Sequence, residues 1–234
     1  MTDPATLHLR PAAPLAERVL LPGDPHRALV VAQALLGGPK MFNHNRGLWG
    51  YTGVARDGEP LTIQSTGMGG PSAAIVVEEL IDLGARTLLR IGTCGALRDG
   101  FELGQIVVAE AVIGTDGTSA ALGAGPRLHP DQALTAALTA GGARAVTALT
   151  TDLFYDPRED APTEWLDDGA DVVEMEAATL LAVADRRGVA AAVVLGVTDL
   201  LATGDRERIR HEDVESLGLA LGEAGWAALA ATAG

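Results

Sequence analysis

Two acidic side chains end an apolar segment of this chain, in the run Val172–Ala178 (VVEMEAA), just before a pattern that predicts a helix. Glu174 and Glu176 are costly there unless they are paired or bind a ligand, because a buried charge loses its hydration. A carboxylate accepts two hydrogen bonds at once, so it suits a vicinal diol such as the 2′- and 3′-hydroxyls of ribose. A helix N-terminus, whose dipole favours acids, explains the run equally well.

An arginine inside another apolar segment indicates a site for an anion. Arg90 follows Thr87–Leu89, and an unpaired guanidinium is disfavoured inside a protein, so Arg90 needs a buried acid or a bound anion. Thr93 adds a hydroxyl donor, and Gly92 and Gly95 allow a ligand to approach the backbone closely. This segment is the strongest indication of phosphate binding in the chain.

A second place for an anion is predicted where the strand Val19–Leu21 leads into a helix. Gly23 offers a bare backbone, the helix start supplies free N–H groups, and Arg27 lies in the first turn, within reach of the same anion. An ordinary turn with proline at the helix start is the alternative. Arg46 lies in a polar loop and by itself would pass for a surface residue.

Three further side chains suit chemistry on a flat, protonatable ligand. Asp199 follows the apolar run Ala190–Val197, where burial favours the protonated carboxyl group that a proton donor requires; a turn or helix cap is the alternative. The ring of Phe154 could stack on a base or lie in the core. No histidine or lysine adjoins Cys94, so we interpret it as a small packing residue and not as a reactive thiol.

The elements that must position these residues alternate between apolar strands and helices. Helices are predicted over Pro25–Leu36, Pro71–Leu83, Asp131–Ala140, Ala177–Arg187 and Glu207–Ala231, and strands over Val19–Leu21, Gly50–Arg56, Pro60–Ser65, Thr87–Ile91, Gln105–Ala111, Ala145–Thr150, Asp171–Glu174 and Ala190–Val197. This alternation predicts an α/β fold with a central mixed, largely parallel β-sheet flanked by helices. In such sheets ligands bind beyond the carboxyl ends of the strands, so we expect the residues above to meet there.

Length and composition predict a single domain, residues 1–234, large enough to fold without disulfides or metals. The net charge of −14 argues against a nucleic-acid or anionic-membrane partner. Cys94 is the only cysteine, Met1–Pro14 has no signal-peptide pattern, and no apolar run reaches about 18 residues, so we expect a cytoplasmic protein. The five histidines are scattered without ligand spacing, and we expect no metal site.

Several of these segments together resemble the hexameric purine and uridine nucleoside phosphorylase family, most of all its bacterial purine members, from about Leu20 to Leu217. The segments that carry the resemblance occur in the family's order. They are Leu21–Pro25 with Arg27, Asn45–Gly47, Gly67–Gly69, Arg90–Gly95, Asp152–Tyr155, Val173–Ala177 and Thr198–Asp199. Several motifs in order are far more specific than any one of them.

The resemblance implies that each candidate residue meets a particular part of the substrate. Phosphate would be held by Gly23, Arg27, Arg90 and Thr93, with Arg46 reaching in from a neighbouring subunit. Ribose would be bound by Met68, Met175 and Glu176, with His8 also donated by that neighbour. The base would lie near Cys94, Gly95, Phe154, Val173 and Glu174. Asp199 would be the general acid, assisted by an arginine for which Arg208 is the best match, with Arg206 and Arg210 close by.

The implied reaction is the reversible phosphorolysis of purine (deoxy)ribonucleosides to the free base and (deoxy)ribose 1-phosphate, with inorganic phosphate as co-substrate and no cofactor. Uridine phosphorylase is an alternative, but Tyr155–Glu164 lacks the glutamine with which that enzyme reads uracil. A methylthioadenosine/adenosylhomocysteine nucleosidase shares the Glu-Met-Glu run, yet a hydrolase does not need the arginines at 27, 46 and 90. A non-enzymatic nucleoside-binding protein is the alternative of a different class.

The residues expected from a neighbour also predict the assembly. Arg46 and His8 serve a site only if a second chain completes it, so we expect a homo-oligomer. By resemblance this is a hexamer, a trimer of dimers, in which both residues cross the dimer interface.

Overall fold

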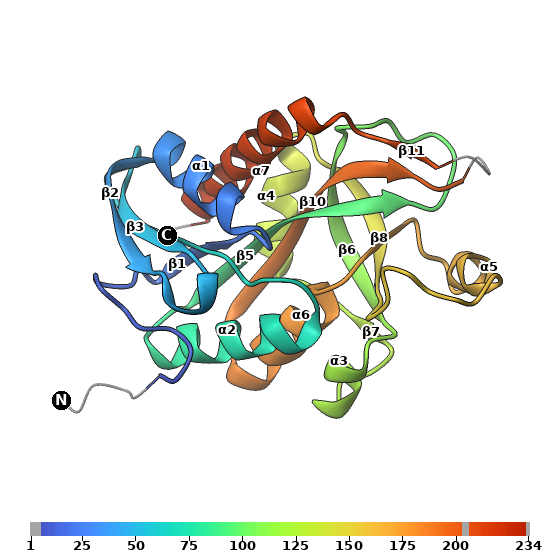
Figure 1. The fold of residues 1–234 in the computed structure, drawn as a ribbon, viewed down its shortest axis with the longest axis horizontal. Helices are drawn as coiled ribbons and strands as arrows, with labels where there is room; N and C mark the ends of the chain where they lie inside the picture. Colours follow the sequence, from blue (N-terminus) through green and yellow to red (C-terminus); the bar gives the residue numbers. More distant parts are fainter. Residues whose placement is uncertain (1–5, 203–205, 233–234) are drawn as a thin grey trace.

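A computed structural model describes residues 6–202 and 206–232, which form helices and strands around one mixed sheet (Figure 1). The strands are β1 (Arg18–Leu21), β2 (Leu36–Asn43), β3 (Gly50–Ala55), β4 (Pro60–Gln64), β5 (Thr87–Ala96), β6 (Ile106–Gly114), β7 (Arg127–Leu128), β8 (Arg144–Thr150), β9 (Val172–Glu174), β10 (Ala190–Leu200) and β11 (Glu207–Arg208). The helices are α1 (Pro25–Leu35), the 3₁₀ helix η1 (Asn45–Gly47), α2 (Gly70–Asp82), α3 (Gly117–Ala121), α4 (Gln132–Ala140), α5 (Ala161–Asp167), α6 (Ala177–Arg187) and α7 (His211–Ala231).

The middle of the sheet is parallel, and its strands close on themselves. β4, β1, β5 and β10 lie side by side in parallel, and β3 and β2 extend this sheet antiparallel. On its other side β10 pairs antiparallel with β6, β8 and β9 follow in parallel, and β9 returns antiparallel to β5. The strands β5, β10, β6, β8 and β9 form a closed ring, in which the carboxyl end of β5 is paired with β9 and β10; the carboxyl end of β10 is paired with β5 and with β11, outside the ring.

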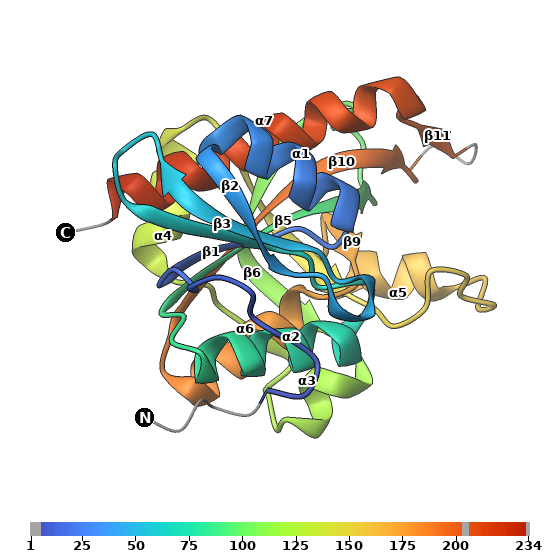
Figure 2. The same cartoon turned by 60° about the vertical axis from the view of Figure 1, so that its left-hand side comes forward.

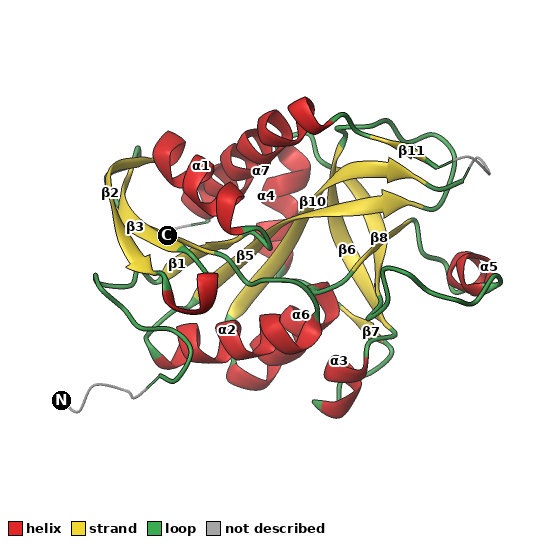
Figure 3. Cartoon of the chain, in the orientation of Figure 1, coloured by secondary structure: helices red, strands yellow, loops and turns green. Residues whose placement is uncertain are grey.

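Helices cover both faces of the sheet (Figures 1 and 3). One core lies between the strands and α2 and α6, and the other lies between the strands and α1, α4 and α7. Alternate side chains of β10 serve the two cores: Val193 and Leu195 pack in the first, Ala192 and Val194 in the second. Because β10 is buried on both faces, its sequence is apolar throughout and does not alternate between apolar and polar residues, as expected for a strand in an α/β sheet.

Local sequence signals set several helix boundaries. Asp24 caps α1, its Oδ1 accepting from the His26 N–H at 2.9 Å, and Pro25 follows at the first helical position. Asp131 caps α4 in the same way through the Leu134 N–H. Gly188 ends α6 in a left-handed conformation that glycine adopts without strain. No helix in residues 6–202 and 206–232 has the length and apolar character that crossing a membrane requires.

Two strands that carry site residues are longer than predicted. We expected β5 to end at Ile91, but it continues through the glycine-rich residues to Ala96, because β10 pairs with it along this whole length. We expected β10 to end at Val197, but it runs to Leu200, so Asp199 lies within a strand. The register between the two strands shifts between Val197 and Asp199, and such a bulge redirects the side chains beside it.

Other boundaries also differ from the prediction. The helix expected from Glu207 begins only at His211, because Glu207 and Arg208 form β11 against β10. The helix predicted over Pro25–Leu36 ends at Leu35, and residues 36–43, for which no strand was predicted, form the edge strand β2. Glycine and proline in this edge strand are typical of a loop, which hid the strand in the sequence.

Candidate active site

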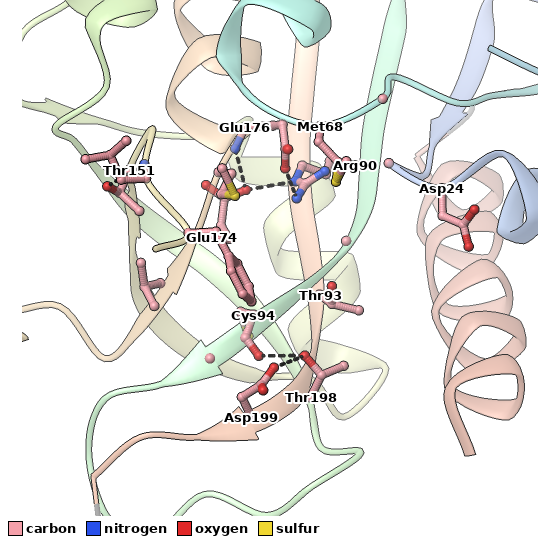
Figure 4. A pocket seen from close by; sticks show the side chains of 18 of the residues that line it. Asp24, Met68, Arg90, Thr93, Cys94, Thr151, Glu174, Glu176, Thr198 and Asp199 are labelled. Atoms are coloured by element: carbon pink, nitrogen blue, oxygen red, sulfur yellow. Dashed lines mark hydrogen bonds and ion pairs between the residues drawn. The ribbon is translucent and has the colours of Figure 1, made fainter. Parts of the chain in front are cut away.

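The largest concentration of predicted site residues lines a cavity of about 540 Å³ at the carboxyl ends of β1, β5 and β10 (Figure 4). All four residues expected at phosphate in the same subunit line it: Gly23, Arg27, Arg90 and Thr93. The expected sugar residues Met68, Met175 and Glu176 line it as well. So do the expected base residues Cys94, Gly95, Phe154, Val173 and Glu174, and the expected acid Asp199. The topological rule for ligands in parallel sheets thus locates the cavity from sequence.

Arg90 lies at the centre of a buried charge cluster. Its Nε donates to Glu174 Oε2 at 3.0 Å, and its Nη2 pairs with Glu176 Oε2 at 2.5 Å. Burial opposes the charged guanidinium, but the carboxylates of Glu176 and Glu174 outweigh that effect and raise the pKa of Arg90. Among the described residues, its buried Nη1 has no hydrogen-bond partner, which leaves one donor for a ligand.

Glu174 uses its carboxylate to organise the protein. Its side chain is fully buried and accepts from Thr150 Oγ1 at 2.5 Å and from the backbone N–H groups of Glu176 and Ala177 at 2.9 Å each. These N–H groups belong to the start of α6, where helical donors otherwise lack partners. Glu174, expected at the base, lines the cavity, and because both of its oxygens are engaged by protein donors its carboxylate also holds Arg90 and the helix start in place.

Glu176 is the more accessible of the two acids. Its Oε1 accepts from the Gly69 N–H at 2.5 Å and its Oε2 from Arg90, while the carboxylate lines the cavity. Figure 4 shows Glu176 and Arg90 on one side of the cavity and Asp199 on the other, with Thr93 and Cys94 between them. Each carboxylate oxygen retains a lone pair, so Glu176 can accept from two hydroxyl groups of a sugar.

Arg27 brings a second guanidinium to the same side. It projects from the first turn of α1, and its Nη1 donates to the Ile91 carbonyl at 3.3 Å. Burial, together with the positive charge of Arg90, lowers the pKa of Arg27, while Asp24 opposes this change. Gly218 of α7 leaves room for the side chain, because a Cβ there would lie 3.2 Å from Arg27 Cγ. Arg27 is partly buried, and its positive charge close to that of Arg90 favours an anion beside the two guanidinium groups.

Asp199 is surrounded by donors at the opposite side. Its Oδ1 accepts from Arg206 Nε at 2.9 Å and Nη2 at 2.8 Å, and its Oδ2 from Thr198 Oγ1 at 2.9 Å. The Arg206 guanidinium also lies 5.0 Å from the centre of the Phe154 ring. The arginine and the aromatic ring therefore form one wall of the cavity together with the acid.

Two of the three candidate arginines contact Asp199, and Arg206 lies nearer to it than the best sequence match, Arg208. Arg208 Nε is 3.7 Å from Asp199 Oδ1 and Arg208 does not line the cavity, whereas Arg206 does. Arg210 pairs with Glu212 and Asp213. Three arginines alternate in this segment, and only the pairing of Arg208 with β10 decides which of them faces the cavity, so sequence could not separate them.

Two of the predicted residues lie away from the cavity of their own subunit. His8 contacts Glu79 of α2, with 2.7 Å between His8 Nδ1 and Glu79 Oε1, and Arg46 lies exposed in η1. Arg46 has φ +59°, the left-handed region that a side chain adopts at a cost, and it is the one such non-glycine residue in the described part of the chain. Both positions agree with residues that would serve another subunit.

Sequence reasoning gave no role to several residues of the cavity wall. They are Asp24, Thr151, Leu153, Trp165, Thr198 and Leu201. Thr198 and Leu201 adjoin Asp199 and could have been found from that proximity. Trp165 comes from the short helix α5, for which we predicted no element, and nothing in its local pattern distinguishes a cavity wall from a core. Within residues 6–202 and 206–232, no His, Cys, Asp and Glu side chains form a group of three or more that could hold a metal ion.

Comparison with known proteins agrees with this geometry. The model of the phosphorylase superfamily matches residues 17–225. A protein of Caldanaerobacter subterraneus subsp. tengcongensis is 39% identical over 204 residues, covering 82% of this chain and 86% of its own length. Proteins of Roseobacter denitrificans (37% over 211 residues, 86% and 88% covered) and Geobacillus kaustophilus (36% over 200 residues, 82% and 84% covered) are similar to a comparable extent. All three are named purine nucleoside phosphorylase DeoD-type. On this evidence the chain belongs to the phosphorylase superfamily.

Proposed function

We propose that this protein is a purine nucleoside phosphorylase, which converts purine (deoxy)ribonucleosides and phosphate into the free base and (deoxy)ribose 1-phosphate. One observation carries the proposal: Arg27 and buried Arg90 line a cavity in which Asp199 lies on the side opposite Arg90. An anion beside the arginines and a base beside the acid would leave the glycosidic bond between them. The names of the similar proteins support the same activity.

The phosphate side explains how the nucleophile would be held. Guanidinium groups match the geometry of phosphate oxygens, Thr93 offers a hydroxyl, and Gly23 lets the ligand approach the start of α1. Phosphorolysis proceeds through a ribosyl cation, for which phosphate is both nucleophile and counter-charge. The protein would therefore work chiefly by positioning the two reactants.

The sugar and base sides follow from the remaining residues. Glu176 would accept hydrogen bonds from the sugar hydroxyls, with Met68 and Met175 against the ring. The base would lie between Phe154 and Val173, near Cys94 and Gly95. Asp199 would deliver a proton to the five-membered ring of the departing purine. Arg206 would orient that carboxyl group and stabilise the anion left after proton transfer.

A homo-oligomer is part of the proposal. His8 and Arg46 would enter the site of the neighbouring subunit, His8 towards the sugar and Arg46 towards phosphate, in a hexamer built as a trimer of dimers. A cytoplasmic location accords with this activity on metabolites. The assignment to purines is supported by the absence of a glutamine from Tyr155–Glu164. Arg158, the arginine of that segment, pairs with Asp156 and Glu164 and does not line the cavity.

The decisive experiment is a panel of inosine, guanosine, adenosine and uridine, each assayed with and without inorganic phosphate, with release of base and formation of ribose 1-phosphate both measured. Phosphorolysis predicts purine release that depends on phosphate and produces ribose 1-phosphate in equal amount. Equal turnover without phosphate would indicate a nucleosidase. Binding without turnover would indicate a nucleoside-binding protein, and uridine as the preferred substrate would exclude the purine assignment.

A further inference from the structure

The segment that carries His8 is held by one carboxylate of α2. Glu79 Oε1 accepts from the N–H groups of Leu7 at 3.1 Å and His8 at 3.0 Å, and Oε2 accepts from the N–H group of Leu9 at 2.6 Å. Glu79 Oε1 also lies 2.7 Å from the imidazole Nδ1 of His8. In Figure 2 the dark blue chain that follows the N-terminus runs beside α2, so this contact joins two otherwise separate parts of the fold.

The same segment is tied to the turn that carries Arg46. Asn45 Nδ2 donates to the His8 carbonyl at 2.8 Å, and Asn43 Oδ1 accepts from the Arg10 N–H at 2.9 Å. Asn43 also donates to the Leu48 carbonyl at 2.5 Å, which closes the turn around Arg46. His8 and Arg46, far apart in sequence, therefore belong to one hydrogen-bonded cluster.

The chemistry of Glu79 fixes the state of the imidazole. A carboxylate only accepts hydrogen bonds, so His8 Nδ1 must carry the proton and donate, and in the neutral ring Nε2 remains an acceptor. The Glu79 side chain is 13% exposed. Burial disfavours its ionised form, but the N–H of Leu9 and the His8 ring and backbone outweigh burial and lower the pKa of Glu79, so it is ionised at neutral pH.

We propose that Glu79 is a positioning residue for sugar binding: it sets the orientation and tautomer in which His8 presents Nε2 to a nucleoside sugar bound in the neighbouring subunit. This inference rests on the proposed function and assigns a role to a residue outside the cavity. A carboxylate that only anchored the chain would need the backbone contacts alone. The additional contact with the ring directs a particular nitrogen outwards.

The test compares Glu79→Gln with Glu78→Gln. The second variant removes a carboxylate from the adjacent position of α2, where it pairs with Arg187 and not with the His8 segment. A glutamine at position 79 has one acceptor oxygen for four donors, and its NH₂ group faces N–H groups. We expect the KM for inosine to rise about 10-fold in Glu79→Gln, with kcat and the KM for phosphate within about twofold of wild type. Glu78→Gln should leave all three parameters within about twofold.

A double-mutant cycle with His8→Ala separates positioning from a general structural effect. If Glu79 acts through His8, Glu79→Gln should raise the inosine KM less than about twofold further in the His8→Ala background. Glu79→Asp keeps the charge but has a side chain one methylene shorter, so it should raise the KM for inosine less than Glu79→Gln does. It replaces Glu79→Gln in the test if that variant does not fold. An unchanged inosine KM in folded Glu79 variants would overturn the inference, as would a full additional effect without His8. The proposed function fails separately, if wild-type protein shows no turnover that depends on phosphate.

Discussion

At the scale of the residue, Arg90 shows what sequence can and cannot establish about a buried charge. Its position in an apolar strand predicts that a guanidinium there must have an acid or an anion as partner. The structure supplies the acids, since two of its nitrogens contact Glu174 and Glu176, and a third nitrogen has no partner among the described residues and remains for an anion. Sequence could not predict this pairing, because Arg90 and Glu174 are 84 positions apart and only the pairing of β5 with β9 brings them together.

The role of Asp199 leads to a prediction about substrate preference. In Asp199→Asn the departing base receives no proton from this position, and loss of such a donor costs about 10²–10⁴-fold in rate. We expect the larger loss for adenosine, because a 6-oxopurine stabilises the charge left on the base through its oxygen and depends less on protonation. The measurement is kcat/KM for adenosine, inosine and guanosine in variant and wild type. Equal losses on all three would count against Asp199 as the proton donor.

The burial of Cys94 makes a second prediction at this scale. Burial, reinforced by the negative charge of Glu174, raises the pKa of the thiol well above its usual range, so the reactive thiolate is not populated at pH 8. We expect iodoacetamide to leave the folded protein unmodified at pH 8, as judged by intact mass. The same chain unfolded in guanidinium chloride should take up one label, since Cys94 is its only cysteine. Rapid labelling of the folded protein would show that the thiol is not held as described.

At the scale of the element, the sequence predicts the existence of the central strands and helices better than their ends. Apolar runs identify β1, β5, β8 and β10 because both faces of the sheet are covered. The continuation of β5 through Gly92 and Gly95 was missed, because glycines usually mark turns, whereas here they make room for other side chains. A Cβ at Gly92 would lie 2.7 Å from Arg90 Cζ, and one at Gly95 would lie 2.7 Å from Leu201 Cδ1. The segment from Gly92 to Gly95 resembles a loop in the sequence, but it is part of a strand whose glycines have no side chains and so leave space beside the cavity.

Gly92 therefore offers a prediction about how a strand positions its arginine. In Gly92→Ala the new methyl group would displace the Arg90 guanidinium, so we expect the KM for phosphate to rise about 10-fold or more, while the protein stays folded. Gly125→Ala is the control, because a Cβ there meets nothing within 4 Å and its φ is not in the left-handed region. Steady-state kinetics with phosphate as the varied substrate provide the measurement. A phosphate KM like that of the control would mean that Arg90 can shift without loss.

At the scale of the whole molecule, α2 relates two sites that would belong to different subunits. Its N-terminus adjoins Glu176, through the Gly69 N–H, and its later turns carry Glu79, which holds the His8 segment. The family resemblance predicts that His8 and Arg46 serve a neighbour, and neither residue lines the cavity of its own subunit. Composition and periodicity could not have predicted it, since both residues resemble ordinary surface residues in the sequence.

This arrangement predicts that two inactive variants restore each other. A subunit with Arg46→Ala would keep its own cavity intact but would not supply its neighbour with an arginine at phosphate. A subunit with Asp199→Asn would lack the acid in its own cavity but would still donate Arg46 to its neighbour. In a mixed dimer, the cavity of the Arg46→Ala subunit has its own Asp199 and receives Arg46 from its partner, so one of the two sites is complete. Co-expression with two different affinity tags, followed by tandem purification, should therefore recover adenosine phosphorolysis of about a quarter of the wild-type value, because about half of the dimers in a randomly assembled hexamer are mixed and each mixed dimer has one complete site. Either variant alone should retain only a small fraction. If Arg46 acted within its own subunit, mixing could not restore a complete site. Mixed oligomers whose activity does not exceed the mean of the two variants would therefore place Arg46 outside the neighbouring site.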